Sequence, residues 1–225
     1  MELIGSKGII FAADIEQREN LFHVIQQVNP YVEAVKIGNV VLYEHGFDII
    51  KDIKKYTDKP IILDLKLMDV PFIVQRIAER ALTKGADGIV VCGPAGGDTI
   101  AVCRNIFKNK LVFVFTQFTD FSGLITDEMA DEYIDLALVL KCNGIFAPGT
   151  MPQRISEIRR KIGKDLLIIA CGIGKQGPKI GSGIAAGADY EIIGRYIYGE
   201  EKMMRTSSEI AKEIKESIWG SLKNV

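Results

Sequence analysis

The chain has 225 residues, of which 48% are hydrophobic and 25% are charged, and its formal net charge is −1. This ordinary globular composition argues against a nucleic-acid-binding protein, which usually carries a basic face. The longest apolar runs are far shorter than the roughly 18 residues that a membrane-spanning helix requires, so we expect neither nucleic acid nor a membrane as a partner.

Short apolar runs alternate with longer amphipathic segments along the chain. The predicted strands are residues 8–14, 31–38, 60–66, 87–92, 110–116, 143–147, 166–171 and 189–193. The predicted helices are residues 17–28, 40–55, 71–84, 97–107, 127–141, 151–162, 178–187 and 203–218. Most of the strands are continuous runs of Val, Ile and Leu, as in parallel strands buried on both faces. This alternation predicts either a barrel or a doubly wound open sheet.

Charged residues at the ends of strands favour the barrel. Asp14 ends the first predicted strand, Lys36 ends the second, and Asp64 and Lys66 end the third. Barrel enzymes keep their chemistry at the carboxyl ends of the strands. No G-x-G-x-x-G follows the first strand, as a dinucleotide fold would require. Because no linker or shift in composition divides the sequence, we predict one α/β domain over residues 1–225, a (β/α)8 TIM barrel.

The N-terminal residues and the cysteines indicate the compartment. Residues 1–8 show no charged segment followed by an apolar run and a cleavage site, so we expect no secretion signal there. The cysteines are Cys92, Cys103, Cys142 and Cys171. They form no C-x-x-C pair, and both histidines lie away from them, so we expect reduced thiols and no zinc site. A cytoplasmic protein follows from these two expectations.

The segment Leu63–Pro71 is the most informative part of the sequence. Alternate residues of a strand point the same way, so Asp64 and Lys66 share a side while the leucines around them face the helices. Two buried ions cost several kcal/mol each unless they are paired, and Lys36 on the neighbouring strand could complete an alternating array. Asp69 lies in the turn before a proline that suits the start of the next helix. A single such pair is more often a structural salt bridge, but charges at three strand ends favour a catalytic site.

Two glycine-rich turns follow the last two predicted strands. They contain Gly172 and Gly174 in one turn, and Gly194 and Arg195 in the other. Barrels often bind phosphate between these two loops, where glycines let backbone N–H groups approach an anion and Arg offers a bidentate fork. Residues 172–183 hold five glycines, which predicts either a flexible surface loop or a lid over the phosphate.

The pattern Asp64-x-Lys66-x-x-Asp69 resembles the signature of the orotidine 5'-monophosphate decarboxylase superfamily, and the following Val70-Pro71 resembles the Ile-Pro of the decarboxylase itself. The resemblance extends over residues 14–197. It implies a TIM barrel that decarboxylates orotidine 5'-phosphate to UMP and CO2 in de novo pyrimidine biosynthesis. It also implies that no cofactor or metal takes part and that the enzyme is a homodimer.

The resemblance further implies a role for each charged residue of the segment. Asp14 and Lys36 would hold the ribose hydroxyls, and Asp64 would lie against the substrate carboxylate. Lys66 would protonate C6 of the pyrimidine as CO2 departs. Asp69 would reach across the dimer interface into the partner's site.

The remaining implied contacts involve the loops. Thr119 would contact the pyrimidine, Gln176 would span base and phosphate, and Gly194-Arg195 would grip the phosphate. Three positions depart from the common pattern of the superfamily. Ile73 replaces a Thr, Thr119 replaces a Ser, and Ala170-Cys171 replaces Ser-Pro. We expect these departures to affect the fine substrate contacts.

Two other functions remain open from the sequence. One is a magnesium-dependent sugar-phosphate decarboxylase or aldolase of the same superfamily, which usually has an acidic residue near the position of Lys36; this chain reads Lys36-Ile37-Gly38. The other is a non-catalytic barrel that only binds a phosphorylated ligand, against which the intact Lys66 and its acidic neighbours argue.

Overall fold

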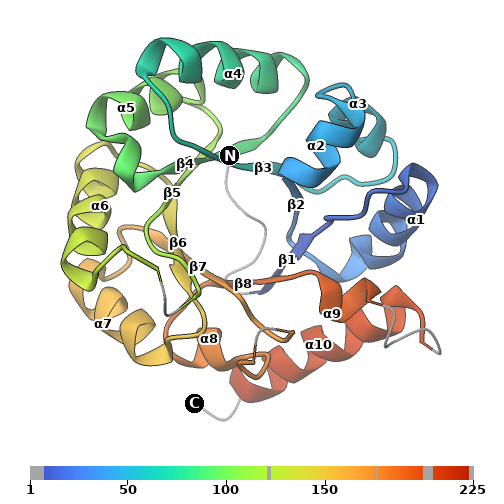
Figure 1. Cartoon of the computed structure of the whole chain (residues 1–225). Helices are drawn as coiled ribbons and strands as arrows, with labels where there is room; N and C mark the ends of the chain where they lie inside the picture. The colour runs from blue at the N-terminus through green and yellow to red at the C-terminus, as the bar shows by residue number, and fades with distance from the viewer. Residues whose placement is uncertain (1–7, 121–122, 176, 200–204, 223–225) are drawn as a thin grey trace.

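The computed structural model describes residues 8–120, 123–175, 177–199 and 205–222 (Figure 1). In this part of the chain eight parallel strands pair in sequence order, and the last pairs with the first to close a barrel. The strands are β1 (Gly8–Ala12), β2 (Ala34–Gly38), β3 (Ile61–Leu67), β4 (Gly88–Cys92), β5 (Leu111–Phe115), β6 (Gly144–Pro148), β7 (Leu167–Cys171) and β8 (Tyr190–Ile193). The predicted TIM barrel is confirmed.

Helices surround the barrel as an outer ring (Figure 1). They are α1 (Arg18–Val28), α2 (Asn39–His45), α3 (Ile49–Ile53), α4 (Pro71–Thr83), α5 (Gly97–Ile106), α6 (Asp127–Val139), α7 (Pro152–Ile162), α8 (Ser182–Ala185), α9 (Arg195–Tyr198) and α10 (Ser207–Leu222). Short 3-10 turns follow α1 and β4, at Asn29–Tyr31 and Gly93–Ala95. No described helix is both long enough and apolar enough to cross a membrane.

Four predicted elements were wrong in extent by three residues or more. The helix expected over 203–218 is α10, which begins at Ser207 and ends at Leu222. The single helix expected over 40–55 is two helices, because Gly46 adopts a φ of 66° and ends α2. The helix expected over 178–187 is helical only over the four residues of α8, between Gly181 and Gly187, which both have positive φ. The strand expected from residue 31 begins at Ala34, since a 3-10 turn over Asn29–Tyr31 precedes it.

The apolar strands are buried on both faces. Ile10, Ile62, Phe113 and Ile169 belong to the cluster that fills the barrel interior. The residues between them on each strand, such as Phe11, pack outward against the helices. Because two apolar layers meet each strand, the sequence shows continuous hydrophobic runs where a half-exposed sheet would alternate.

The amino-terminal end of the barrel is closed by ion pairs. The buried carboxylate of Asp87 accepts hydrogen bonds from Lys54 at 2.8 Å, from Lys110 at 2.5 Å and from the backbone N–H of Ile61 at 3.1 Å. Burial alone would raise the pKa of Asp87, but these hydrogen bonds outweigh it and hold the pKa below its usual value. Asp87 therefore stabilises the end of the barrel opposite the charged array described next.

Candidate active site

Four charged side chains form a chain of contacts at the carboxyl end of β1, β2 and β3. Lys66 Nζ lies 2.9 Å from both carboxylate oxygens of Asp64. Lys36 Nζ lies 3.5 Å from Asp64 Oδ2, and 3.2 and 3.3 Å from the two carboxylate oxygens of Asp14. The predicted alternating array is therefore confirmed in the order Lys66, Asp64, Lys36, Asp14.

The strand positions of two members differ from the prediction. Asp14 lies two residues beyond the end of β1, and Lys36 lies in the middle of β2. Lys36 still reaches the mouth because its side chain is long and points inward. Gly38 leaves the room for this arrangement, since a Cβ placed there would lie 2.4 Å from Asp14 Oδ1.

The two middle side chains of the array are buried, and the two end side chains are partly exposed. The side chains of Asp64 and Lys36 are each 7% exposed, whereas those of Lys66 and Asp14 are 37% and 36% exposed. Burial of Lys36 works against its charge, but the nearby carboxylates of Asp64 and Asp14 outweigh burial and raise its pKa. A buried lysine with a raised pKa thus lies behind the more exposed side chains of Lys66 and Asp14.

The backbone at Lys66 is strained. Lys66 has a φ of 45°, in the left-handed region that costs a non-glycine residue on the order of 1–3 kcal/mol. The register between β3 and β4 shifts between Leu63 and Leu67, so the strand bulges at this residue. Bulges next to active sites re-aim a side chain, and here the bulge directs the ammonium group toward Asp64.

An apolar floor lies beneath the array. Lys66 Nζ is 5.4 Å from the centre of the buried Phe115 ring, and the Cys92 thiol donates to the Lys66 carbonyl at 3.4 Å. Cys171, which stands where the superfamily usually has Pro, lies close enough to the array for Asp64 and Lys66 to influence its titration. Burial raises the pKa of Cys92 to about 11 and that of Cys171 to about 12. The floor therefore adds no charge, and a low-polarity surrounding strengthens the electrostatics above it.

A cavity of about 250 Å³ continues from the array toward the loops after β7 and β8. Its lining includes Asp14, Gly172, Lys175, Gly194 and Arg195. Two cations and a glycine-rich backbone around one space are suited to an anion. Three of the predicted phosphate contacts, Gly172, Gly194 and Arg195, therefore line one cavity together with Asp14.

Other predicted residues lie elsewhere. Gly174 borders a neighbouring cavity on the outer side of the same loop. Thr119 is half-buried, and its carbonyl accepts a hydrogen bond from the Thr150 hydroxyl at 2.8 Å. Asp69 is exposed, and its carboxylate accepts the backbone N–H of Val70 at 2.7 Å. Gln176 lies outside the described residues.

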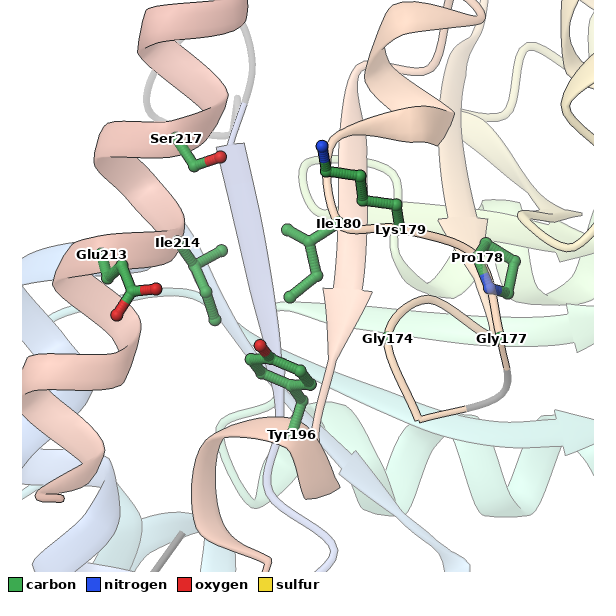
Figure 2. Close-up of a pocket in the computed structure, with 9 residues that line it drawn as sticks. All are labelled: Gly174, Gly177, Pro178, Lys179, Ile180, Tyr196, Glu213, Ile214 and Ser217. Atoms are coloured by element: carbon green, nitrogen blue, oxygen red, sulfur yellow. The ribbon is translucent and has the colours of Figure 1, made fainter. Parts of the chain in front are cut away.

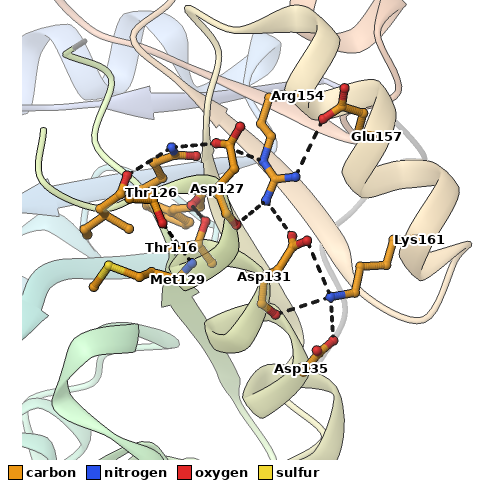
Figure 3. A network of polar contacts seen from close by, with 12 residues as sticks. Thr116, Thr126, Asp127, Met129, Asp131, Asp135, Arg154, Glu157 and Lys161 are labelled. Carbon is orange, nitrogen blue, oxygen red and sulfur yellow. Dashed lines mark hydrogen bonds and ion pairs between the residues drawn. The ribbon is translucent and has the colours of Figure 1, made fainter. Parts of the chain in front are cut away.

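Sequence reasoning missed a polar network that holds the loop after β5 (Figure 3). Gln117 is buried and donates to the Ile125 carbonyl at 3.3 Å and to Asp127 Oδ1 at 2.9 Å. The guanidinium of the buried Arg154 on α7 pairs with Asp127 and Asp131 of α6. No local pattern marks these residues, because the network joins three segments. Lys175, which was also missed, could have been found as the cation inside the glycine-rich run.

Among the described residues, no three His, Cys, Asp or Glu side chains gather in a way that could hold a metal ion. The closed barrel, the charged array at its carboxyl end and the adjoining anion cavity define the class of protein: a TIM barrel with its polar site where barrel enzymes perform catalysis.

Comparison with known proteins identifies the family. Residues 7–210 match the family described as "Orotidine 5'-phosphate decarboxylase / HUMPS family", and the chain belongs to it. An orotidine 5'-phosphate decarboxylase of Pyrococcus furiosus is 33% identical over 95% of this chain and 99% of its own length. One from Methanosarcina mazei is 35% identical over 94% of this chain and 97% of its own.

A solved structure shows the same fold. The crystal structure of orotidine 5'-monophosphate decarboxylase from Methanocaldococcus jannaschii, complexed with the inhibitor BMP, superposes with a TM-score of 0.86 at 32% identity. The match covers 95% of this chain and 99% of that one.

Proposed function

We propose that this protein decarboxylates orotidine 5'-phosphate to UMP and CO2, a step of pyrimidine biosynthesis, and that it is a carboxy-lyase that needs no cofactor. The observation that carries the proposal is the Lys66–Asp64–Lys36–Asp14 array, which adjoins a cavity suited to a phosphate. The family also includes other sugar-phosphate enzymes, but the relatives at 33–35% identity are named as orotidine 5'-phosphate decarboxylases. The segment Lys36-Ile37-Gly38 also lacks the acidic residue that the magnesium-dependent enzymes usually have near Lys36.

The array gives each residue a role in the reaction. The phosphate would bind between Arg195 and the loop after β7, and Asp14 and Lys36 would hold the ribose hydroxyls. This placement brings C6 of the pyrimidine toward Lys66. Asp64 then lies beside the substrate carboxylate.

Breaking the bond between C6 and the carboxylate releases CO2 and leaves its electron pair on C6. The Lys66 ammonium faces that developing charge, stabilises it and transfers a proton to C6. Solvent then returns a proton to the Lys66 amine. The mechanism is therefore electrostatic stabilisation followed by protonation, and every proton and electron is accounted for by substrate, Lys66 and water.

Asp64 contributes through repulsion of the substrate carboxylate and through its contacts with Lys66 and Lys36. Two unit charges about 4 Å apart repel by roughly 4 kcal/mol at an effective dielectric constant near 20. The Asp64 carboxylate beside the substrate carboxylate provides such a repulsion, which disappears as neutral CO2 leaves. The two lysines on either side of Asp64 hold its carboxylate in place while the substrate binds.

The test is direct. Orotidine 5'-phosphate mixed with the protein should lose its ultraviolet absorbance as UMP forms, equally with and without EDTA. Loss of activity in EDTA that returns with Mg²⁺ would support the metal-dependent alternative instead. Binding of UMP without any turnover of orotidine 5'-phosphate would support the non-catalytic barrel.

A homodimer in which Asp69 enters the partner's site belongs to the same proposal. Large exposed apolar side chains lie next to Asp69 in the chain and on α2: Met68, Val70, Phe72 and Ile73, and Val40 and Tyr43. Apolar surface gathered in this way marks interaction sites. Tyr43 is 86% exposed, and beside it a cavity of about 200 Å³ links α2 to β3 and α4. Ile73, which replaces a Thr, adds to the apolar character of this face.

Mixing two inactive variants tests the role of Asp69. If Asp69 acts across an interface, Lys66→Ala and Asp69→Ala proteins should regain activity on subunit exchange, because one site of each hybrid dimer is intact. Random exchange should restore roughly a quarter of the wild-type activity. No recovery despite verified exchange would contradict a role in the partner's site.

We also place the protein in the cytoplasm. All four cysteines are free thiols, three of them buried. Unpaired thiols are typical of a reducing compartment. The intermolecular partners we expect are the nucleotide substrate and a second copy of the chain.

A further inference from the structure

The loop that follows β7 separates two cavities. Its inner side borders the anion cavity at Gly172 and Lys175. Its outer side borders a second cavity of about 350 Å³, which lies between the loop and α10 and is lined by Lys179 and Glu213 among others (Figure 2). Because open space lies on both sides of the loop, its position depends strongly on how its two ends are held. One end continues from β7.

The other end is held by a buried carboxylate. Glu191 of β8 points outward from the barrel and is fully buried. Its carboxylate accepts the backbone N–H groups of Gly181 at 2.8 Å, Gly183 at 2.8 Å and Ile184 at 3.3 Å. Within the described part of the chain, no ion pair accompanies these bonds. The described hydrogen bonds of the Glu191 carboxylate therefore all go to the end of the loop and the first turn of α8.

Two glycines make this contact possible. Gly181 has a φ of 90°, which turns the chain into α8. A Cβ at Gly183 would lie 2.8 Å from the Ala170 Cβ and 3.1 Å from Glu191 Oε1, so only glycine lets the backbone come this close to β7 and β8. The loop end, the glycines and the carboxylate thus fit one another.

Placing the Glu191 carboxylate in this buried position costs free energy. Burial raises the pKa of Glu191, and the three backbone N–H groups only partly oppose the effect. The place between β8 and α8 is otherwise apolar, with Ile193 next on the same face and Ile184 opposite. An aliphatic side chain would satisfy packing there, so packing alone does not account for Glu191.

We propose that Glu191 is a positioning residue for the phosphate end of the site: it fixes the Gly181 end of the loop and so helps to hold Lys175 against the anion. The inference rests on the proposed function, because it assumes that the anion is the phosphate of orotidine 5'-phosphate. Glu191 touches no substrate atom and acts through the loop.

The experiment compares Glu191→Leu and Glu191→Gln with the wild-type enzyme. Leu removes the acceptor oxygens and keeps an apolar filling, and Gln keeps one acceptor oxygen. The matched control is Asp189→Asn, at the amino-terminal end of the same strand, where the carboxylate accepts the Ile168 N–H at 2.8 Å and pairs with Arg159, away from the loop. For each protein we would measure the dissociation constant of UMP, kcat/KM for orotidine 5'-phosphate and for orotidine, and Tm.

Glu191→Leu should weaken UMP binding and raise KM for orotidine 5'-phosphate roughly 10- to 100-fold, the loss expected when several hydrogen bonds that hold the loop are removed. Its kcat/KM for orotidine, which has no phosphate, should change less than about threefold. Glu191→Gln should show an intermediate loss. Asp189→Asn should leave the ratio of the two kcat/KM values unchanged whatever its Tm.

Three results would overturn the inference. They are wild-type UMP affinity in both Glu191 variants, an equal loss for both substrates, and the same change of ratio in Asp189→Asn. If Glu191→Leu does not fold, the ratio in Glu191→Gln decides. Failure of the wild-type protein to convert orotidine 5'-phosphate would instead contradict the proposed function.

Discussion

Replacing Lys36 by Met removes the cation that two carboxylates share. Lys36 Nζ lies 3.5 Å from Asp64 Oδ2 and within 3.3 Å of both Asp14 oxygens, and its side chain is buried. The methionine side chain is of similar length, so the main change is loss of charge. Asp64 would retain only Lys66, and Asp14 would lose the ion pair described for it.

The size of the effect follows from the geometry. At 3.5 Å and an effective dielectric constant near 20, one such pair attracts by about 5 kcal/mol, part of which offsets desolvation of the two ions. Removing one partner of a buried pair typically costs about 3–5 kcal/mol. For a domain of this size each kcal/mol lowers Tm by about 2–4 °C, so we expect a fall of roughly 6–20 °C. Activity should fall at least roughly 100-fold, because ribose contacts and the placement of Asp64 are both lost.

Thermal unfolding followed by circular dichroism, together with a decarboxylation assay, measures both effects. Lys54→Met is the control, because Lys54 is half-exposed and its partner Asp87 keeps Lys110. That variant should lose at most about 1 kcal/mol and little activity. A Lys36→Met protein as stable and as active as the control would refute the idea that Lys36 is the shared cation of the site.

Two more predictions concern other carboxylates. The pKa of Asp87 is lowered in the folded protein, so its stabilising contribution is present above the unfolded pKa of about 3.9 and is lost as pH falls through the lower folded value. Asp87→Asn should therefore lower Tm at pH 7 and reduce the dependence of Tm on pH below pH 4, measured by scanning calorimetry, and an unchanged pH profile would contradict this. Gly38→Ala should push the Asp14 carboxylate away and raise KM for orotidine 5'-phosphate roughly tenfold. Tm should change little, since Asp14 is partly exposed and can move. An unaltered KM in steady-state assays would show that the position of Asp14 does not depend on the space left by Gly38.

Local patterns were sufficient to predict the barrel and the centre of the site. The alternation of strand residues placed Asp64 and Lys66 on one side, and the structure has them 2.9 Å apart. The position of Lys36 on the preceding strand was enough to add it to the array, although it lies in mid-strand and not at the strand end. These predictions succeeded because they depend on residues two apart, or on neighbouring strands that follow each other in sequence.

What could not be predicted depends on contacts between distant segments. Gly46 did not mark the end of a helix in the sequence, because a glycine inside an amphipathic run can also continue the helix, and only the structure shows its φ of 66°. Gln117, in the loop after β5, and Arg154, on α7, both contact Asp127 of α6, so this network exists only once the three segments come together. Glu191 reads as an ordinary charge in an apolar strand until the fold shows that Gly181 and Gly183 lie against it.

The central claim is that the Lys66 ammonium stabilises and protonates C6, and the Lys66→Ala variant tests it most directly. We would measure single-turnover conversion of orotidine 5'-phosphate beside a UMP titration of the same protein. The account predicts that conversion becomes undetectable while UMP still binds within roughly tenfold of the wild-type affinity, because the phosphate cavity remains intact. Conversion at the wild-type rate by that variant would show that the proton reaches C6 from another group.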